Sequence, residues 1–327
     1  MITCEDVKAA YRLILGRDPE SEEIVMQYAR EIGSLDDLRR AFCCSPEFHN
    51  IPWIHVPWLH SPGRPLDWPP ILVEIDASDA QLSKMMEHIE ANWHNLGLSD
   101  PHWSVLVDEA FRVENIAHEE ARFYESGKQD VDRLERTAER CGKSLSGLKH
   151  CFELGCGVGR MTAWLAALFE RVAAVDISPA HLGFARQAVH GLGRNNVDLV
   201  HLESFAALEE LPEFDVFLSF IVLQHNPPPL IAALLRIILS KLRAGGIAYF
   251  QVPTYRLNYH FEVNEYLRTI SPTSGMEIHV LPQYVLFDIL ERSGCHLLEC
   301  REDHWTGDYG TISNTIFAEK RADAAFQ

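Results

Sequence analysis

The chain has few basic residues and lacks long apolar runs. Its 327 residues include 29 Lys and Arg against 47 Asp and Glu, which gives a formal net charge of −18 at pH 7. Such a charge repels the phosphates of nucleic acids and the anionic surfaces of membranes. The apolar runs fall short of the length that crosses a bilayer. We therefore expect neither a nucleic-acid substrate nor membrane insertion.

Cysteine pairs and a secretory segment are also missing. The eight cysteines include no Cys-x-x-Cys pair. Glu5, Asp6 and Lys8 interrupt the apolar residues at the N-terminus, so a signal peptide is not predicted. These absences together predict a cytoplasmic protein whose thiols stay reduced.

The most informative stretch is a glycine-rich turn. Residues 151–154 form a short apolar run, typical of a buried parallel strand, and residues 161–169 have the pattern of an amphipathic helix. Backbone N–H groups at such a turn face a ligand, and glycine lets the ligand approach closely. A second strand ends at Asp176, a carboxylate that suits the two hydroxyls of a ribose. The pattern predicts a nucleoside-binding α/β domain. The glycines of the turn are Gly155, Gly157 and Gly159.

The spacing of these glycines separates two classes of nucleoside-binding protein. A dinucleotide motif, G-x-G-x-x-G, would require glycine at position 160, where this chain has Arg160. The spacing therefore disfavours a nicotinamide dehydrogenase. The sequence E-L-G-C-G-V-G and the ordered motifs over residues 148–253 resemble the class I S-adenosylmethionine-dependent methyltransferases. The resemblance covers about a third of the chain and implies S-adenosyl-L-methionine as the cofactor.

The resemblance also implies roles for individual residues. Glu153 and the glycine loop would face the methionine part of the cofactor, Asp176 would bind the ribose, and Ile177 would pack on the adenine. Glu203 and Ser204 would reach the adenine amine, although relatives often carry Asp in place of Glu203. Segments before the glycine turn would fold over the cofactor as a lid. The cofactor site expected in this way comprises Tyr124, Gly127, Glu153, Gly155, Cys156, Gly157, Gly159, Arg160, Asp176, Ile177, Glu203, Ser204, Ser219 and Phe220.

Two histidines are the candidate catalytic residues. A hydroxyl acceptor needs a general base because its pKa lies far above 7, and histidine suits that role. His225 follows a strand at its carboxyl end, where ligands bind in open α/β sheets, and His279 precedes the last helix. His304 is a third candidate. Asp303, His304 and Asp308 could bind a metal, but their spacing is not diagnostic, so no metal site is predicted.

The segment S-F-I-V-L-Q-H-N-P-P-P around His225 resembles motif IV of methyltransferases that act on substrates other than nucleic acids. It lacks the Asn/Asp-Pro-Pro-Tyr pattern that holds a flipped base or an amide. The N-terminal residues 3–48, with Y-R-L-I-L-G-R-D-P-E-S and F-C-C-S-P-E-F, resemble a helical domain related to phycobilisome linkers. That domain occurs on bacterial surface-layer proteins and on enzymes of surface-glycan synthesis, which implies a protein partner and a glycan-related acceptor. An ordinary helical cap on the enzyme is the alternative.

The expected architecture is a doubly wound α/β fold. Its sheet is predicted to have seven mostly parallel strands, with the last strand antiparallel, beside a small all-helical N-terminal domain. Residues 130–139 are predicted to form a charged helix with a solvated face. The expected parts are the helical domain at 1–50, a Pro/Trp-rich connector at 51–77, a helical lead-in with a candidate lid at 78–147, and the cofactor domain at 148–327 with a substrate insertion near 254–280.

These features predict a bacterial S-adenosylmethionine-dependent methyltransferase. The preferred reaction is O-methylation of a sugar or glycan intermediate by in-line transfer, with a histidine base. One alternative is a small-molecule N- or O-methyltransferase. The other is a cofactor-binding interaction protein without catalysis, in which the helical N-terminus is the interaction module.

Overall fold

A computed structural model describes residues 2–49, 69–271, 275–307 and 310–322, and the chain divides into two compact units, residues 1–68 and 69–327. In the described part of the chain, every helix is too short or too polar to span a bilayer. The first unit is helical. Its first helix begins with a capping box, in which Thr3 Oγ1 accepts from the Asp6 N–H at 3.2 Å and the Asp6 carboxylate accepts from the Thr3 N–H at 2.8 Å. The segments are α1 (Cys4–Ala10), η1 (Tyr11–Leu15), α2 (Glu22–Glu31), α3 (Leu35–Cys43) and α4 (Pro46–His49).

Apolar side chains from the first three helices form the core of this unit, with Val7, Val25, Leu38 and Phe42 fully or almost fully buried. The connector expected at 51–77 lies outside the described residues up to position 68. After it, the second unit begins with a short strand, β1 (Leu72–Val73), which pairs in parallel with β7 (His260–Phe261).

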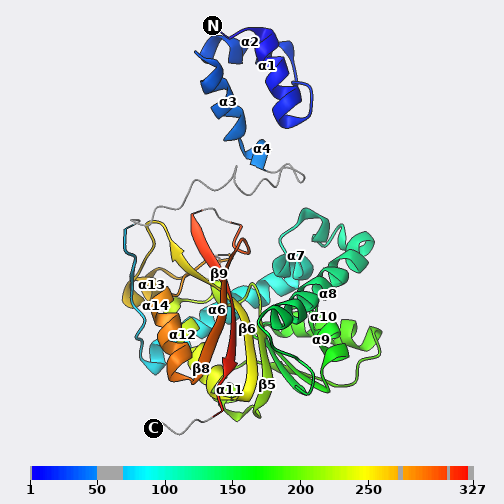
Figure 1. Ribbon diagram of the computed structural model, residues 1–327, viewed down its shortest axis with the longest axis vertical. Coiled ribbons are helices and arrows are strands. Elements are labelled where there is room, and N and C mark those ends of the chain that lie inside the picture. The colour runs from blue at the N-terminus through cyan, green and yellow to red at the C-terminus, as the bar shows by residue number, and fades with distance from the viewer. Residues whose placement is uncertain (1, 50–68, 272–274, 308–309, 323–327) are drawn as a thin grey trace. The chain divides into compact units, whose positions relative to one another are not determined.

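The second unit is built on a seven-stranded sheet (Figure 1). The strand order is β4-β3-β2-β5-β6-β9-β8. All strands run parallel except β9, which is antiparallel to both of its neighbours. The predicted mostly parallel sheet with an antiparallel last strand is therefore confirmed. The strands are β2 (His150–Leu154), β3 (Arg171–Asp176), β4 (Val197–His201), β5 (Phe214–Ser219), β6 (Leu242–Arg256), β8 (Cys295–Asp303) and β9 (Thr311–Lys320).

Helices cover both faces of this sheet (Figure 1). One face carries Phe152, Phe217 and Phe250, which pack against α6, α11, α12 and α14 in the larger core. The other face packs mainly against α8 and α9. Strands buried on both faces need apolar side chains at nearly every position, as β2 and β5 have. The helices are α6 (Asp79–Ser99), α7 (Pro101–Val105), α8 (Ile116–Arg140), α9 (Thr162–Leu168), α10 (Pro179–Gly191), α11 (Phe205–Glu210), α12 (Pro228–Ser240), α13 (Val263–Thr269) and α14 (Gln283–Arg292).

Helix α8 differs from the charged, solvated helix predicted for residues 130–139. Val131, Leu134 and Ala138 are buried against the sheet, and Asp130 is buried beside Arg160, with 2.7 Å between their charged atoms. The prediction failed because charged residues outnumber apolar ones in this segment, while the apolar ones recur at helical spacing on a single face. The lead-in segment therefore belongs to the core of the second unit.

Candidate active site

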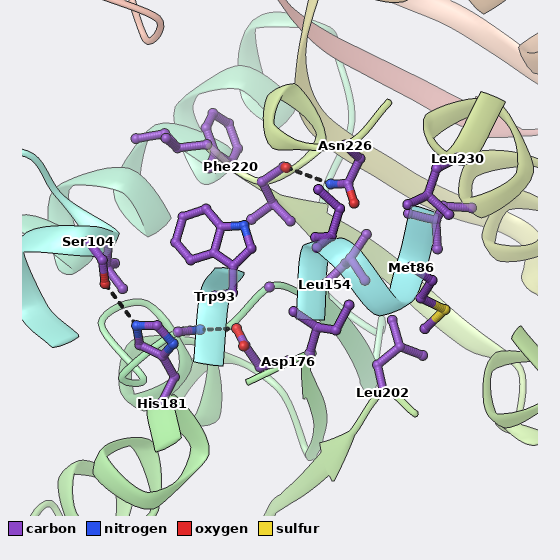
Figure 2. Close-up of a pocket in the computed structure, with 18 residues that line it drawn as sticks. Met86, Trp93, Ser104, Leu154, Asp176, His181, Leu202, Phe220, Asn226 and Leu230 are labelled. Atoms are coloured by element: carbon purple, nitrogen blue, oxygen red, sulfur yellow. Dashed lines mark hydrogen bonds between the residues drawn. The ribbon is translucent and has the colours of Figure 1, made fainter. Parts of the chain in front are cut away.

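A cavity opens at the carboxyl ends of β2, β3 and β5, where ligands bind in open α/β sheets (Figure 2). Its empty space, counted out to the open mouth, is about 760 Å³. Among the described residues that line it, Asp176 is the one carboxylate, and none of them is a lysine or arginine. The lining consists of Met86, Ile89, Trp93, Ser104, Val105, Leu154, Gly155, Gly157, Asp176, Ile177, His181, Leu202, Phe220, Ile221, Val222, Asn226, Leu230 and Leu234.

The glycine loop forms the floor of the cavity between β2 and α9. Gly155 has φ 73° and Gly157 has φ 54°, a left-handed backbone that favours glycine. A Cβ atom at Gly155 would overlap the side chain of Val222, and one at Gly157 would lie 2.6 Å from Val105 Cγ2. Glycine is therefore required here by backbone conformation and by space.

Asp176 fixes this loop from the end of β3. Its Oδ2 accepts from the Gly157 N–H at 2.7 Å (Figure 2). Its Oδ1 accepts from the Ser178 N–H at 2.8 Å. The side chain is buried yet lines the cavity. Because each carboxylate oxygen has two acceptor sites, both oxygens can still accept a hydroxyl of a ligand.

Glu153 is a second acidic residue close to the glycine loop. It is fully buried in β2, and its Oε2 accepts from Thr162 Oγ1 at 2.7 Å. Its Oε1 has no hydrogen-bond partner among the described residues. Burial raises the pKa of this carboxyl group to about 7, since the charged form is poorly solvated there. A cationic ligand above the loop would stabilise the ionised form.

Three of the predicted cofactor residues lie outside the cavity lining, in the contact between α8 and the glycine loop. Tyr124 Oη donates to the Val158 carbonyl at 3.2 Å. Gly127 packs so closely that a Cβ there would overlap the backbone of Arg160. Arg160 turns toward α8, where it donates to Ser126 Oγ at 3.1 Å. Through these contacts, α8 supports the glycine loop from outside the cavity.

The other predicted residues divide between the lining and its surroundings. Ile177 and Phe220 line the cavity, whereas Cys156 is buried and Gly159 packs on Ala185. Outside the lining, Ser219 donates to the Leu154 carbonyl at 3.1 Å, Ser204 caps α11, and Glu203 is exposed beside His201. His304 is exposed, and the carboxylate of Asp303 accepts from Thr315 Oγ1 at 2.7 Å, while Asp308 lies outside the described residues.

Sequence reasoning missed the residues that α6, α7 and α10 contribute to the cavity. Met86, Ile89 and Trp93 lie on one side of α6 at positions i, i+3 and i+7, a spacing that could have identified this face. Trp93 lies at the centre of the lining (Figure 2). His181 lines the cavity from α10, and its Nε2 lies 2.8 Å from Ser104 Oγ.

His225 has both ring nitrogens engaged within the protein. Its Nδ1 lies 2.7 Å from the Glu277 carbonyl, which only accepts, so Nδ1 carries the proton. Its Nε2 lies 3.2 Å from the side-chain Nε2 of Gln224 and accepts from it. Burial lowers the pKa of His225 to about 4. Both ring nitrogens of His225 are thus engaged within the protein, and its lowered pKa makes it a weak base, which disfavours His225 as the general base.

His279 belongs to a different arrangement. Its Nε2 donates to the Glu277 carboxylate at 2.8 Å, and its Nδ1 accepts from Tyr259 Oη at 2.7 Å. Glu277 also accepts from Tyr266 Oη at 2.8 Å and from His88 Nε2 at 2.9 Å. Burial opposes the charge of Glu277, but these hydrogen bonds together outweigh it and lower its pKa to about 2. A hydroxyl, an imidazole and an ionised carboxylate are thus aligned, as in a proton-accepting triad.

The neutral state of His225 gives a pH-dependent stability. Its pKa is about 4 in the folded chain and about 6.5 when unfolded. As the pH falls from 6.5 to 4, the unfolded state binds a proton that the folded state excludes. We expect this residue to lower the free energy of unfolding by up to about 3 kcal/mol over that interval. Urea unfolding at pH 7 and pH 4.5 measures it. In the His225→Gln variant the loss should shrink, and an identical loss in both proteins would contradict the assignment.

Residues 152–248, which contain the glycine loop and Asp176, match the sequence profile of the family described as "Methyltransferase domain". Two curated relatives are similar over part of their length. The ubiquinone biosynthesis O-methyltransferase of Aromatoleum aromaticum is 31% identical over 122 residues, which is 37% of this chain and 48% of that protein. The probable cobalt-precorrin-6B C(15)-methyltransferase (decarboxylating) of Methanothermobacter thermautotrophicus is 32% identical over 130 residues, 39% of this chain and 62% of that protein.

Solved structures of low sequence identity include the magnesium protoporphyrin IX methyltransferase of Synechocystis PCC 6803 with bound S-adenosylmethionine. It is 17% identical with a TM-score of 0.49, over 76% of this chain and all of that one. Among the curated relatives, the chain spans only about half the length of the O-methyltransferase and three fifths of the other.

The cavity has the features that S-adenosylmethionine requires. Glycine at 155 and 157 lets Val222 and Val105 of the cavity wall pack directly on the loop, where a Cβ would overlap them. Asp176 offers a carboxylate for the ribose, and Ile177 and Leu202 offer apolar surface for the adenine. Glu153, whose Oε1 has no hydrogen-bond partner among the described residues, precedes the loop in β2, and its ionised form would supply negative charge for a cationic ligand. Most of the cavity lining belongs to residues 152–248, the stretch that matches the methyltransferase domain, and the cofactor of that domain is S-adenosylmethionine.

Proposed function

We propose that the chain is an S-adenosylmethionine-dependent O-methyltransferase. The observation that carries the proposal is the cavity at the carboxyl ends of β2, β3 and β5, with its glycine loop and Asp176, inside the stretch that matches the methyltransferase domain. Methyl transfer from a sulfonium is an in-line displacement, so the protein mainly has to hold an acceptor atom against the methyl group. Gly155, Gly157 and Asp176 would orient the cofactor, and the apolar wall would exclude water.

A triad made of Tyr259, His279 and Glu277 lies outside the cavity lining, and it would take the proton from an acceptor that extends from the cavity to Tyr259. When the acceptor oxygen attacks, the O–CH₃ bond forms, the S–CH₃ bond breaks and the acceptor loses its hydrogen. The acceptor hydroxyl would pass this proton to Tyr259 as the Tyr259 proton moves to His279 Nδ1. The Glu277 carboxylate would then stabilise the imidazolium, since it already accepts from the other nitrogen. This arrangement supports our proposal of His279, rather than His225, as the base.

We propose a sugar or glycan intermediate as the acceptor, and a bacterial cytoplasm as its setting. The support for a glycan is the resemblance of residues 3–48 to a domain that occurs on surface-glycan enzymes. A second candidate is a small apolar molecule with a hydroxyl group. The apolar lining of the cavity and the similarity to a ubiquinone biosynthesis O-methyltransferase favour that candidate.

Transfer of a labelled methyl group tests the proposed function. The protein is incubated with methyl-labelled S-adenosylmethionine and fractionated bacterial extract. Label in a glycan or glycolipid fraction would support the sugar acceptor, and label in the apolar small-molecule fraction would support the second candidate. Cofactor binding without transfer to any fraction would overturn the proposed activity and favour a cofactor-binding interaction protein.

The triad predicts the effect of two substitutions in this assay. We expect His279→Asn to lower kcat about 100-fold or more, because the proton then has no acceptor, and Tyr259→Phe to have a comparable effect. The affinity for S-adenosylhomocysteine, measured by calorimetry, should stay within about threefold, since neither residue lines the cavity. His304→Asn at an exposed position is the control. Full activity of His279→Asn would exclude His279 as the base.

A further inference from the structure

Ile221 has an unusual backbone conformation in the wall of the cavity. Its φ is 58°, in the left-handed region, and it is a β-branched residue. Such a conformation costs about 1–3 kcal/mol and persists only where the surrounding structure enforces it. Ile221 lines the cavity between Phe220 and Val222. Val222 is the side chain that a Cβ at Gly155 would overlap, so this turn faces the glycine loop directly.

A buried chain of hydrogen bonds runs from the Glu277 carbonyl to the N–H of Ile221. The donor and the acceptor of each bond can be assigned in turn, starting from the Glu277 carbonyl. The Glu277 carbonyl only accepts, so His225 donates from Nδ1 and accepts at Nε2. Gln224 must then donate to His225 through its amide nitrogen, which leaves Gln224 Oε1 as an acceptor. Gln251 Nε2 donates to that oxygen at 3.0 Å.

These assignments also fix the orientation of the Gln251 side-chain amide. Gln251 Nε2 also lies 2.7 Å from Ser313 Oγ, and its Oε1 accepts from the Ile221 N–H at 3.1 Å. Gln251 is fully buried, and Gln224 and His225 are at most 5% exposed. Every donor in the chain meets an acceptor only when the amides point this way. A reversed amide would bring two donors together at a buried site, which is costly.

We propose that Gln251, Gln224 and His225 are positioning residues of the methyltransferase site, which hold Ile221 in its left-handed conformation and thereby shape the cavity wall opposite the glycine loop. This inference rests on the proposed function. The chain begins at Glu277, whose side chain belongs to the Tyr259–His279 triad. The hydrogen-bond chain therefore connects the segment after β6 to the cavity wall opposite the glycine loop. His279 adds a second link, because its N–H donates to the Gln224 carbonyl at 2.7 Å.

Substitution of Gln251 tests the proposal through cofactor affinity, measured by calorimetry with S-adenosylhomocysteine. We expect Gln251→Leu to weaken binding about tenfold or more, because Ile221 loses the acceptor that holds it. Glycine adopts a positive φ without strain. Adding Ile221→Gly to Gln251→Leu should therefore bring the affinity back to within about threefold of Ile221→Gly alone. Thr254→Val is the matched control, since Thr254 is buried in the same strand but bonds Asn314 instead.

Two results would overturn the proposal. One is unchanged affinity in a folded Gln251→Leu variant. The other is a double variant as weak as the product of the two single effects, since a merely structural role of Gln251 allows no rescue at position 221. Failure of the wild-type protein to bind S-adenosylhomocysteine would instead contradict the proposed function itself.

A measurement on the wild-type protein keeps the test independent of folding in the variants. Imidazole ¹⁵N shifts, assigned with His225→Gln, report which nitrogen carries the proton. The proposal expects a neutral ring protonated on Nδ1 at pH 6. With a proton on Nε2, or with a charged ring at that pH, His225 could not accept from Gln224 at Nε2, and the proposal would be overturned.

Discussion

Asp176→Ala is expected to weaken binding of S-adenosylmethionine and S-adenosylhomocysteine about 100-fold or more. The substitution removes the acceptor of the Gly157 and Ser178 N–H groups, so the glycine loop loses its link to β3. It also removes the carboxylate that would accept from the ribose. Hydrogen bonds to a charged acceptor each contribute about 1.5–3 kcal/mol, so the loss of even two accounts for this change. Calorimetry at neutral pH measures it.

Asp215→Ala is the matched control for this prediction. Asp215 also accepts from two backbone N–H groups, those of Lys149 and His150, both at 2.9 Å. These bonds lie at the amino end of β2, opposite the cavity. The control should therefore lose stability, as Asp176→Ala does, but keep its affinity for the cofactor. Equal affinity in both variants would mean that Asp176 has no part in binding.

Gly155→Ala is expected to abolish measurable cofactor binding. A Cβ at this position meets two obstacles, the φ of 73° and the side chain of Val222. The left-handed backbone alone costs about 1 kcal/mol for alanine. The overlap must displace either the loop or the turn at Ile221–Val222, and both form the cavity. We expect an affinity loss of more than about 100-fold with an intact core, measured by calorimetry and thermal unfolding.

Gly193→Ala separates the effect of the positive φ from that of the overlap with Val222. Gly193 has a similar φ of 66°, but no atom lies within 4 Å of the position that a Cβ would occupy. This variant should lose about 1 kcal/mol of stability and bind the cofactor normally. If Gly155→Ala binds as well as Gly193→Ala, the loop does not approach the ligand and the cavity is not the cofactor site.

The parallel sheet could be predicted from sequence because its signals are local. The strands β2, β3 and β5 are short, mostly apolar runs, with Gly155 directly after β2 and Asp176 at the end of β3. The antiparallel direction of β9 was predicted from the strand order that the fold requires. The start of α10 could also be predicted, since Ser178 is an N-cap residue and Pro179 occupies the first helical position.

The residues that could not be predicted are those that long-range packing brings together. Trp93 reaches the cavity from a helix that precedes the glycine loop by more than fifty residues. The positions of Arg160 and Gly127 depend on α8, whose buried face is hidden among charged residues. His225 was correctly located near the carboxyl end of β5, but its role depends on Glu277 and Gln224. Sequence spacing alone does not show which nitrogen of a ring is engaged.

The segment after β6 links the proposed Tyr259–His279–Glu277 triad to the cavity wall at Ile221. His88 on α6 and His279 both donate to Glu277, while the Glu277 carbonyl orients His225. An acceptor that engages Tyr259 would therefore act on the same residue, Glu277, that begins the chain to Ile221. The partly buried Glu277 carboxylate is the group that these polar partners share.

A crystal structure with S-adenosylhomocysteine would test the central claim most directly. The account predicts ligand density in the cavity between the glycine loop and Trp93, with the ribose on the Asp176 carboxylate and Ile221 still at positive φ. Density at another place on the chain, or a cavity that stays empty at a saturating concentration of the ligand, would contradict it.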